Sequence, residues 1–71
     1  MNTIAEDLDA QIAAHCHMKG SRPVLIVLGR METAGLKLTH PLSVTHHDYQ
    51  GISLEERDQA SLVLLIGSGR H

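Results

Sequence analysis

The strongest pattern along the chain is a pair of short aliphatic runs, each closed by a glycine. The runs cover residues 24–28 before Gly29 and residues 62–66 before Gly67. Uninterrupted aliphatic runs of this length are typical of β-strands that are buried on both faces, or that line one face of a crowded core. The pattern predicts strands over about 23–28 and 61–66, paired with each other or central in a sheet.

A helical pattern precedes the first run and predicts a helix over residues 3–19. Thr3 and Glu6 have the spacing of a capping box, in which each side chain satisfies the backbone N–H of the other residue. Gly20 follows as a helix stop. Apolar residues recur every four positions and form one stripe for packing on a sheet. The stripe consists of Ile4, Leu8, Ile12 and Cys16, widened by Ala5 and Ala13.

The middle of the chain has weaker patterns. Residues 31–38 predict one or two loose helical turns that end at Pro41. Residues 42–46 alternate between apolar and polar side chains, which predicts a half-buried strand. Residues 48–51 are turn formers, and residues 52–54 alternate again and predict another short strand.

The last third of the chain allows two structures. Ser53 and Glu56 match a second capping box, which favours a helix over residues 54–65. Alternatively, residues 55–59 form a polar turn between two strands of a hairpin. We favour the hairpin, because a helix leaves part of the aliphatic run at 62–66 in water. The fold class is then α+β, with residues 1–71 as a single small domain in which an N-terminal amphipathic helix packs on a mostly antiparallel sheet of three or four strands.

Size and composition limit the core that this domain can build. The chain has 71 residues, lacks Phe and Trp, and has Tyr49 as its sole aromatic residue. Chains of this size bury only about 60% of the surface that the unfolded chain exposes. Without large aromatic side chains, sharing a surface with a partner is one of the common routes to stability. We therefore expect the chain to bind another protein, a second copy of itself as a homo-oligomer, or both.

Charge and cysteine content argue against several other partners and compartments. The net charge is −2, and the six Lys and Arg residues are spread along the chain, so we expect no nucleic-acid binding. The acidic start is unlike a signal peptide, and no apolar run approaches the ~20 residues that span a bilayer, so we expect no membrane association. With Cys16 as the sole cysteine, an internal disulfide is ruled out. We expect a cytoplasmic location.

Histidine is the unusual component, and it raises the question of metal binding or catalysis. His15 and His17 flank Cys16, His46 and His47 are adjacent, and His40 and His71 complete the set of six histidines. Metal ligands on one helix are usually four positions apart, and neighbours on a strand point to opposite faces, so neither pair forms a site alone. Cys16 lies on the inward stripe, where burial makes a thiol inert. We therefore predict no enzyme activity, no cofactor, and no catalytic, cofactor-binding or metal-binding residue.

One stretch resembles a group of known proteins. Residues 23–32 read Pro-Val-Leu-Ile-Val-Leu-Gly-Arg-Met-Glu, Leu36 follows, and residues 49–54 read Tyr-Gln-Gly-Ile-Ser-Leu before the closing strand. Over residues 23–66 this succession resembles small α+β accessory proteins encoded by tailed phages and prophages. The resemblance implies a viral setting and a role as an accessory protein or an inhibitor of a host protein. It carries over no functional residue.

The expected function is a non-enzymatic protein-binding module, of the phage accessory type, that docks on a host protein. Two alternatives stay open. One is a self-assembling structural protein, such as a minor virion component. The other is a metal-binding protein that uses its histidines.

Overall fold

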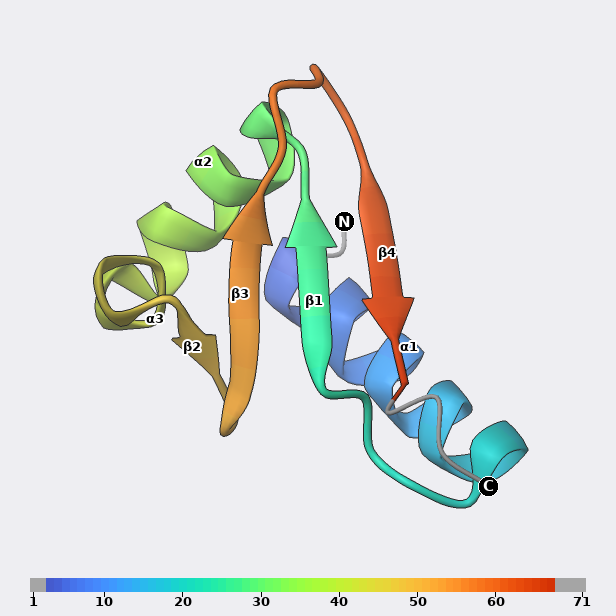
Figure 1. Cartoon of the computed structure of the whole chain (residues 1–71). Helices are drawn as coiled ribbons and strands as arrows, with labels where there is room; N and C mark the ends of the chain where they lie inside the picture. The colour runs from blue at the N-terminus through green and yellow to red at the C-terminus, as the bar shows by residue number, and fades with distance from the viewer. Residues whose placement is uncertain (1–2, 68–71) are drawn as a thin grey trace.

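The computed structural model describes residues 3–67, which form a four-stranded sheet with its helices on one side (Figure 1). Helices α1 and α2 lie behind the sheet in this view, and α3 lies beside its β2 edge. The strand order is β2-β3-β1-β4. The elements are α1 (Ile4–Lys19), β1 (Leu25–Leu28), α2 (Arg30–Thr39), α3 (Pro41–His46), β2 (Asp48–Tyr49), β3 (Ile52–Glu56) and β4 (Val63–Ile66). The predicted α+β class is confirmed.

Helix α1 begins and ends where its sequence predicts. The capping box is complete: the Thr3 N–H donates to Glu6 Oε1 at 3.0 Å, and the Glu6 N–H donates to Thr3 Oγ1 at 3.2 Å. Gly20 closes the helix in the left-handed conformation, with φ 74°, and its N–H donates to the Cys16 carbonyl. The predicted stripe faces the sheet: Ala5, Leu8 and Ile12 are buried, Ile4 and Cys16 pack partly buried against them, and Ala13 is exposed.

The two aliphatic runs are paired, as predicted, but the hairpin prediction is wrong. Strand β1 pairs antiparallel with β4 and parallel with β3, so it lies between the two strands that were expected to be neighbours. Residues 57–62 form a connection that crosses over the end of β1. This arrangement gives the most apolar strand two neighbours instead of one. The alternative helix over 54–65 is also excluded, because β3 continues to Glu56 and β4 begins at Val63.

Residues 42–46 form a helix, and the strand predicted there is wrong. Pro41 occupies the first turn of α3, where its missing N–H costs nothing and its fixed φ favours the helix. A five-residue alternation is too short to distinguish a strand from a single helical turn. Helix α2 is likewise longer than the loose turns predicted over 31–38.

The residues read as a turn at 48–51 contain a strand that the sequence did not predict. Asp48 and Tyr49 pair with β3, and the reversal is confined to Gln50 and Gly51. These two residues have φ values of 53° and 79°. A two-residue loop with positive φ at both positions is the preferred connection of a tight hairpin, and Gly51 adopts it without steric cost.

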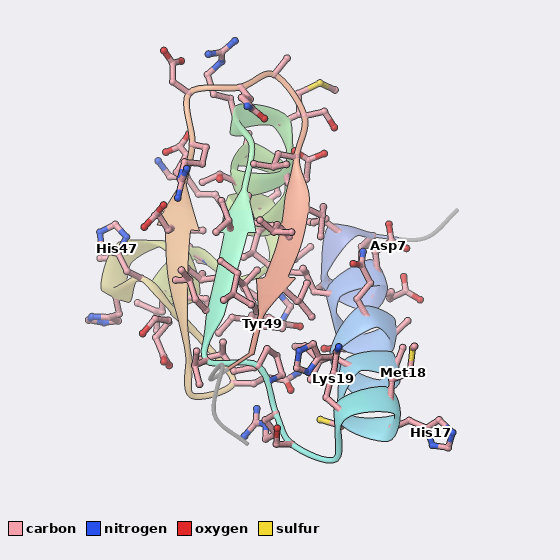
Figure 2. All side chains as sticks on the ribbon, turned by 45° about the vertical axis from the view of Figure 1, so that its right-hand side comes forward. Asp7, His17, Met18, Lys19, His47 and Tyr49 are labelled. Carbon is pink, nitrogen blue, oxygen red and sulfur yellow. The ribbon has the colours of Figure 1, made fainter. Side chains whose placement is uncertain are left out.

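Tyr49, the sole aromatic residue, lies in the core where α1 meets β2 (Figure 2). Its hydroxyl donates to Asp9 Oδ1 at 2.7 Å, and the same oxygen accepts from Gln50 Nε2 at 2.6 Å. The ring meets His40 edge-on, with 5.6 Å between the ring centroids. Burial, and then the hydrogen bond and charge of Asp9, raise the pKa of Tyr49 to about 12. The phenol therefore stays a neutral donor at physiological pH and ties α1 to the β2–β3 hairpin.

The buried stripe of α1 gives a direct test of this packing. Leu8 is fully buried, so we expect Leu8→Ala to lower the free energy of unfolding by about 2–5 kcal/mol, from lost transfer energy and the cavity left behind. Urea unfolding followed by circular dichroism measures this change. The matched control is Met18→Ala on the same helix, where the side chain is 79% exposed, with an expected change below about 0.5 kcal/mol. A cost below about 0.5 kcal/mol for Leu8→Ala would contradict the packing.

Candidate interaction surface

Ligands of α/β proteins commonly bind at the carboxyl ends of parallel strands, where a following helix begins. Strands β1 and β3 are parallel, and α2 begins directly after β1. At this position the first N–H groups of α2 already have partners from the chain itself. Arg30 N–H donates to the Gln59 carbonyl at 2.8 Å, and Met31 N–H donates to the Ala60 carbonyl at 3.0 Å. Residues 57–62 thus occupy the place that an anionic ligand takes in such folds.

The junction is closed further by Glu32 and Gly29. Glu32 accepts hydrogen bonds from the Ser61 hydroxyl at 2.5 Å and from the Leu62 N–H at 2.9 Å. Burial raises the pKa of Glu32, but these bonds, together with those from the backbone at the start of α2, outweigh that effect and lower the pKa below its usual value. A Cβ atom on Gly29 would lie 2.6 Å from the Leu62 nitrogen, so the close approach of the two segments requires glycine. The junction is a packed structural joint.

The charged side chains at this end of the sheet neutralise one another. Arg30 forms an ion pair with Asp58, and Arg57 forms one with Glu55. A shallow surface hollow lies among Arg30, Glu56, Arg57 and Asp58. Because it combines two cations with two anions, it has no excess charge with which to select a phosphate or a metal ion.

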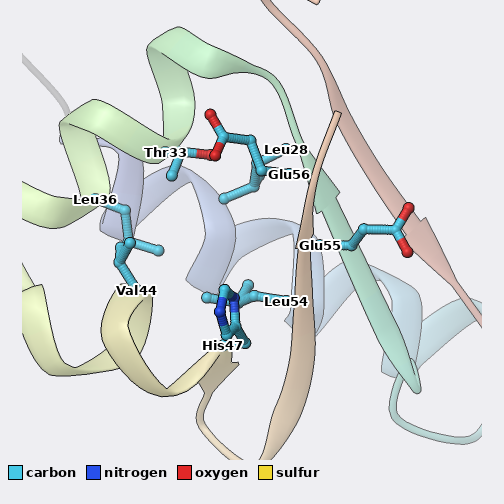
Figure 3. A pocket seen from close by; sticks show the side chains of 8 residues that line it. All are labelled: Leu28, Thr33, Leu36, Val44, His47, Leu54, Glu55 and Glu56. Atoms are coloured by element: carbon cyan, nitrogen blue, oxygen red, sulfur yellow. The ribbon is translucent and has the colours of Figure 1, made fainter. Parts of the chain in front are cut away.

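A small cavity lies between the helices and β3 (Figure 3). Its volume is about 40 Å³, which admits a few water molecules, whereas pockets for cofactors or drug-sized ligands have about 300–1,000 Å³. Figure 3 shows Glu55 pointing away from the other lining side chains, to the opposite side of β3. The lining residues are Leu28, Thr33, Leu36, Val44, His47, Leu54, Glu55 and Glu56. This cavity does not provide a substrate-binding site.

Two of the candidate metal ligands lie against other polar groups of the chain. His15 Nδ1 lies 3.2 Å from the Ser21 carbonyl, and His40 Nδ1 lies 2.9 Å from Thr39 Oγ1. His47 ends α3 in the left-handed conformation, so it is not on a strand as expected. Within residues 3–67, no three His, Cys, Asp or Glu side chains are grouped so as to hold a metal ion. His71 lies outside the described residues.

The most distinctive surface is the side of the sheet that faces away from the helices. Ile26 and Leu28 point into the helix-covered core, so strand alternation directs Leu25 and Val27 to the other side. In the register of the sheet, Val27 lies between Glu55 and Leu64, and Leu25 lies between Ser53 and Ile66. We call the apolar patch formed by Leu25, Val27, Leu64 and Ile66 the open face.

The open face contains more apolar surface than the described chain covers. Val27 is only 1% exposed because neighbouring side chains of the sheet surround it, but Leu64 is 48% exposed and Ile66 is 36% exposed. None of the described helices packs on this side (Figure 1). The aliphatic runs have the pattern of strands that are buried on both faces or that line one face of a crowded core, and of the four open-face residues Val27 alone is fully buried. Leu64 and Ile66 therefore keep apolar surface in contact with water on this side of the described chain.

The two edges of the sheet differ in how they are protected. Strand β2 has only two residues and carries Asp48, and short charged edges resist further pairing. Strand β4 at the other edge has no charged residue and no proline from Ser61 to Gly67. The Gly29 N–H donates to the Leu62 carbonyl at 2.9 Å, so Leu62, Leu64 and Ile66 direct their backbone groups to β1. The backbone groups of Val63 and Leu65 therefore point to the outer side of the sheet.

A second set of exposed apolar side chains lies on the helices. Met31 and Leu38 are two turns apart on α2, and Leu42 follows in α3. Leu38 is 87% exposed. These side chains lie on the helical layer, so the sheet separates them from the open face. We refer to Met31, Leu38 and Leu42 as the helix stripe.

Comparisons with protein-family models, with curated proteins and with solved structures found no match. Among the helices of residues 3–67, none combines the length and the apolar character needed to cross a membrane.

The sequence did not predict the open face or the β4 edge, although it did predict the two aliphatic strands that form them. The uninterrupted aliphatic run at 62–66 was the feature of the sequence that could have indicated them, because alternate residues of a strand point to opposite faces of a sheet.

The Glu32 junction predicts a pH dependence of stability. Because the folded pKa lies below the unfolded value near 4.5, the contribution of Glu32 is complete above about pH 4.5 and is lost as the pH falls through the folded pKa. We expect Glu32→Gln to lower the free energy of unfolding by about 1 kcal/mol near pH 7 and by less near pH 3. Urea midpoints across this range measure the difference.

The control for this test is Glu56→Gln, which removes an exposed carboxylate at the same end of the sheet. It should leave the unfolding free energy near pH 7 unchanged within about 0.5 kcal/mol. A Glu32→Gln deficit that stays constant from about pH 7 to about pH 3 would show that the carboxylate charge has no role in the joint.

Proposed function

We propose that the chain is a non-enzymatic protein-binding module that binds its partner through the open face. The observation that carries this proposal is the exposure of Leu64 and Ile66 beside Val27, on a side of the sheet that the described helices leave uncovered. Contiguous exposed apolar patches are typical of protein interaction sites. Burial of such surface contributes about 25 cal/mol per Å² of apolar area.

The small core supports the same function. The fully buried large side chains are Leu8, Ile26, Val27, Leu28 and Leu36. All five are aliphatic, and a core of this size leaves little stability in reserve. A bound partner stabilises the folded state by mass action, in proportion to its affinity and concentration.

The chemistry of the open face defines the kind of partner. Glu55 lies next to Val27 on this side of the sheet, and it pairs with Arg57. A complementary surface is therefore apolar and nearly uncharged. In line with the resemblance of residues 23–66, we propose a phage-type accessory protein or inhibitor that docks on a host protein in the cytoplasm.

One alternative also has an observation in its favour. A self-assembling structural protein, such as a minor virion component, is supported by the uncharged β4 edge, which is suited to pairing with another strand. The histidine-based metal protein has no such support, since the histidines of residues 3–67 form no cluster of three ligands with one another or with Cys, Asp or Glu.

The decisive experiment compares two exposed leucines on different surfaces. The chain is tagged at its N-terminus, away from β4, and used to capture partners from host lysate as wild type, Leu64→Glu and Leu38→Glu. We expect the wild type and Leu38→Glu to retain one stoichiometric partner. Leu64→Glu should retain it at least about tenfold less, because a carboxylate is then desolvated in an apolar interface.

Circular dichroism and thermal unfolding must first show that both variants are folded. Loss of the partner with Leu38→Glu alone would assign binding to the helix stripe and contradict the role of the open face. Failure of the folded wild-type chain to retain any protein would contradict the proposed function as a whole.

A further inference from the structure

We propose that a second copy of this chain pairs with the outer edge of β4, antiparallel, about a two-fold axis that passes beside Leu64. The inference goes beyond the proposed function, because it concerns the outer edge of β4, whereas the proposed partner covers the open face. The two sheets then join into one continuous sheet of eight strands. The open faces of both copies form a single apolar surface.

The backbone of β4 supplies the hydrogen bonds for this pairing. Val63 and Leu65 direct their N–H and C=O groups outward, since the carbonyls of Leu62 and Ile66 are bonded toward β1. An antiparallel pair centred on Leu64 places Val63 of each copy opposite Leu65 of the other. Both positions then exchange N–H···O=C bonds in both directions. All of the outward-pointing backbone groups of the strand are used.

The absence of charge along the edge favours a second copy over a foreign partner. The residue on a two-fold axis lies next to its own counterpart, so a charged residue there would face a like charge. Residues 61–67 contain none. A foreign partner selected by electrostatics is usually met by complementary charges at the rim, and this strand offers none.

The side chains of β4 also suit the pairing. With Leu64 on the axis, the two Leu64 side chains meet on the open face as a non-hydrogen-bonded pair, the closer of the two antiparallel pair types. Ile66 extends the apolar contact on each side of them. The Leu64 side chain is half exposed in the single chain and has apolar company in the pair.

The small size of the contact limits its expected strength. A standard stable interface covers about 800 Å² of each partner, which is about one sixth of the 4896 Å² surface of this chain. One short strand covers less than that. We therefore expect a reversible dimer with a dissociation constant of about 1 µM to 1 mM, not a permanent one.

A charge exchange at Leu64 tests the axis directly. Sedimentation velocity is measured from about 10 µM to about 1 mM for the wild type, Leu64→Lys, Leu64→Glu and an equimolar mixture of the two variants. We expect the wild type to approach twice the 7.8 kDa chain mass with increasing concentration. Each variant alone should dimerise roughly tenfold more weakly or worse, and the mixture should regain dimerisation through opposite charges at the axis.

Matched controls carry the same charges elsewhere on the same side of the sheet. Ser53→Lys and Ser53→Glu change β3, which lies two strands from the proposed axis, and both should dimerise like the wild type. In a Cys16→Ala background, Leu64→Cys should form a disulfide-linked dimer on mild oxidation, and Ser53→Cys should not.

The inference is overturned if the wild type remains monomeric throughout the concentration range. It is also overturned if both Leu64 variants dimerise as well as the wild type, or if Leu64→Cys forms linked dimers no faster than Ser53→Cys. A monomeric chain that still loses a captured host protein through Leu64→Glu would remove the dimer and leave the proposed function standing. A wild-type chain that dimerises but captures no other protein would support the dimer and contradict the proposed function.

Discussion

The central position of β1 is the constraint on which the rest of the structure depends. This strand is four residues long, and Ile26, Val27 and Leu28 are almost completely removed from water. Such a strand needs a neighbour on each side and cover on both faces. Strands β3 and β4 are its neighbours, and α1 and α2 cover one of its faces. Because β3 and β4 lie on opposite sides of β1, residues 57–62 must cross over the end of β1 to connect them.

The same constraint explains why the chain's own backbone fills the usual ligand position after β1. Since the 57–62 connection passes over the end of β1, its carbonyls accept the first N–H groups of α2, and its Ser61 and Leu62 donate to Glu32. The N–H groups at the start of α2, which bind an anion in many such folds, are bonded here to the 57–62 connection. These contacts make the junction at the end of β1 part of the packing of the fold.

Covering β1 on one side only leaves a sheet with two unequal sides and two unequal edges. The helix-covered side is filled by aliphatic side chains and by Tyr49, whose hydroxyl is satisfied by Asp9. The other side keeps Leu64 and Ile66 in contact with water. An apolar open face beside an uncharged edge strand is the basis of the two contacts that we propose, one with a partner protein on the face and one with a second copy along the edge.

The sequence alone determined the elements whose signals are local. The capping box of Thr3 and Glu6, the four-residue repeat of α1 and the two aliphatic runs depend on neighbouring residues, and each lies where it was predicted. Tertiary structure decided what these local signals could not. Residues 42–46 form a helix because five alternating residues fit either a helical or a strand period, and Pro41 favours a helix start. Asp48–Tyr49 form a strand because they pair with β3. The strand order places β1 between β3 and β4, and this order creates the open face and the outer β4 edge. Strand order depends on how the whole chain packs, so local sequence signals do not determine it.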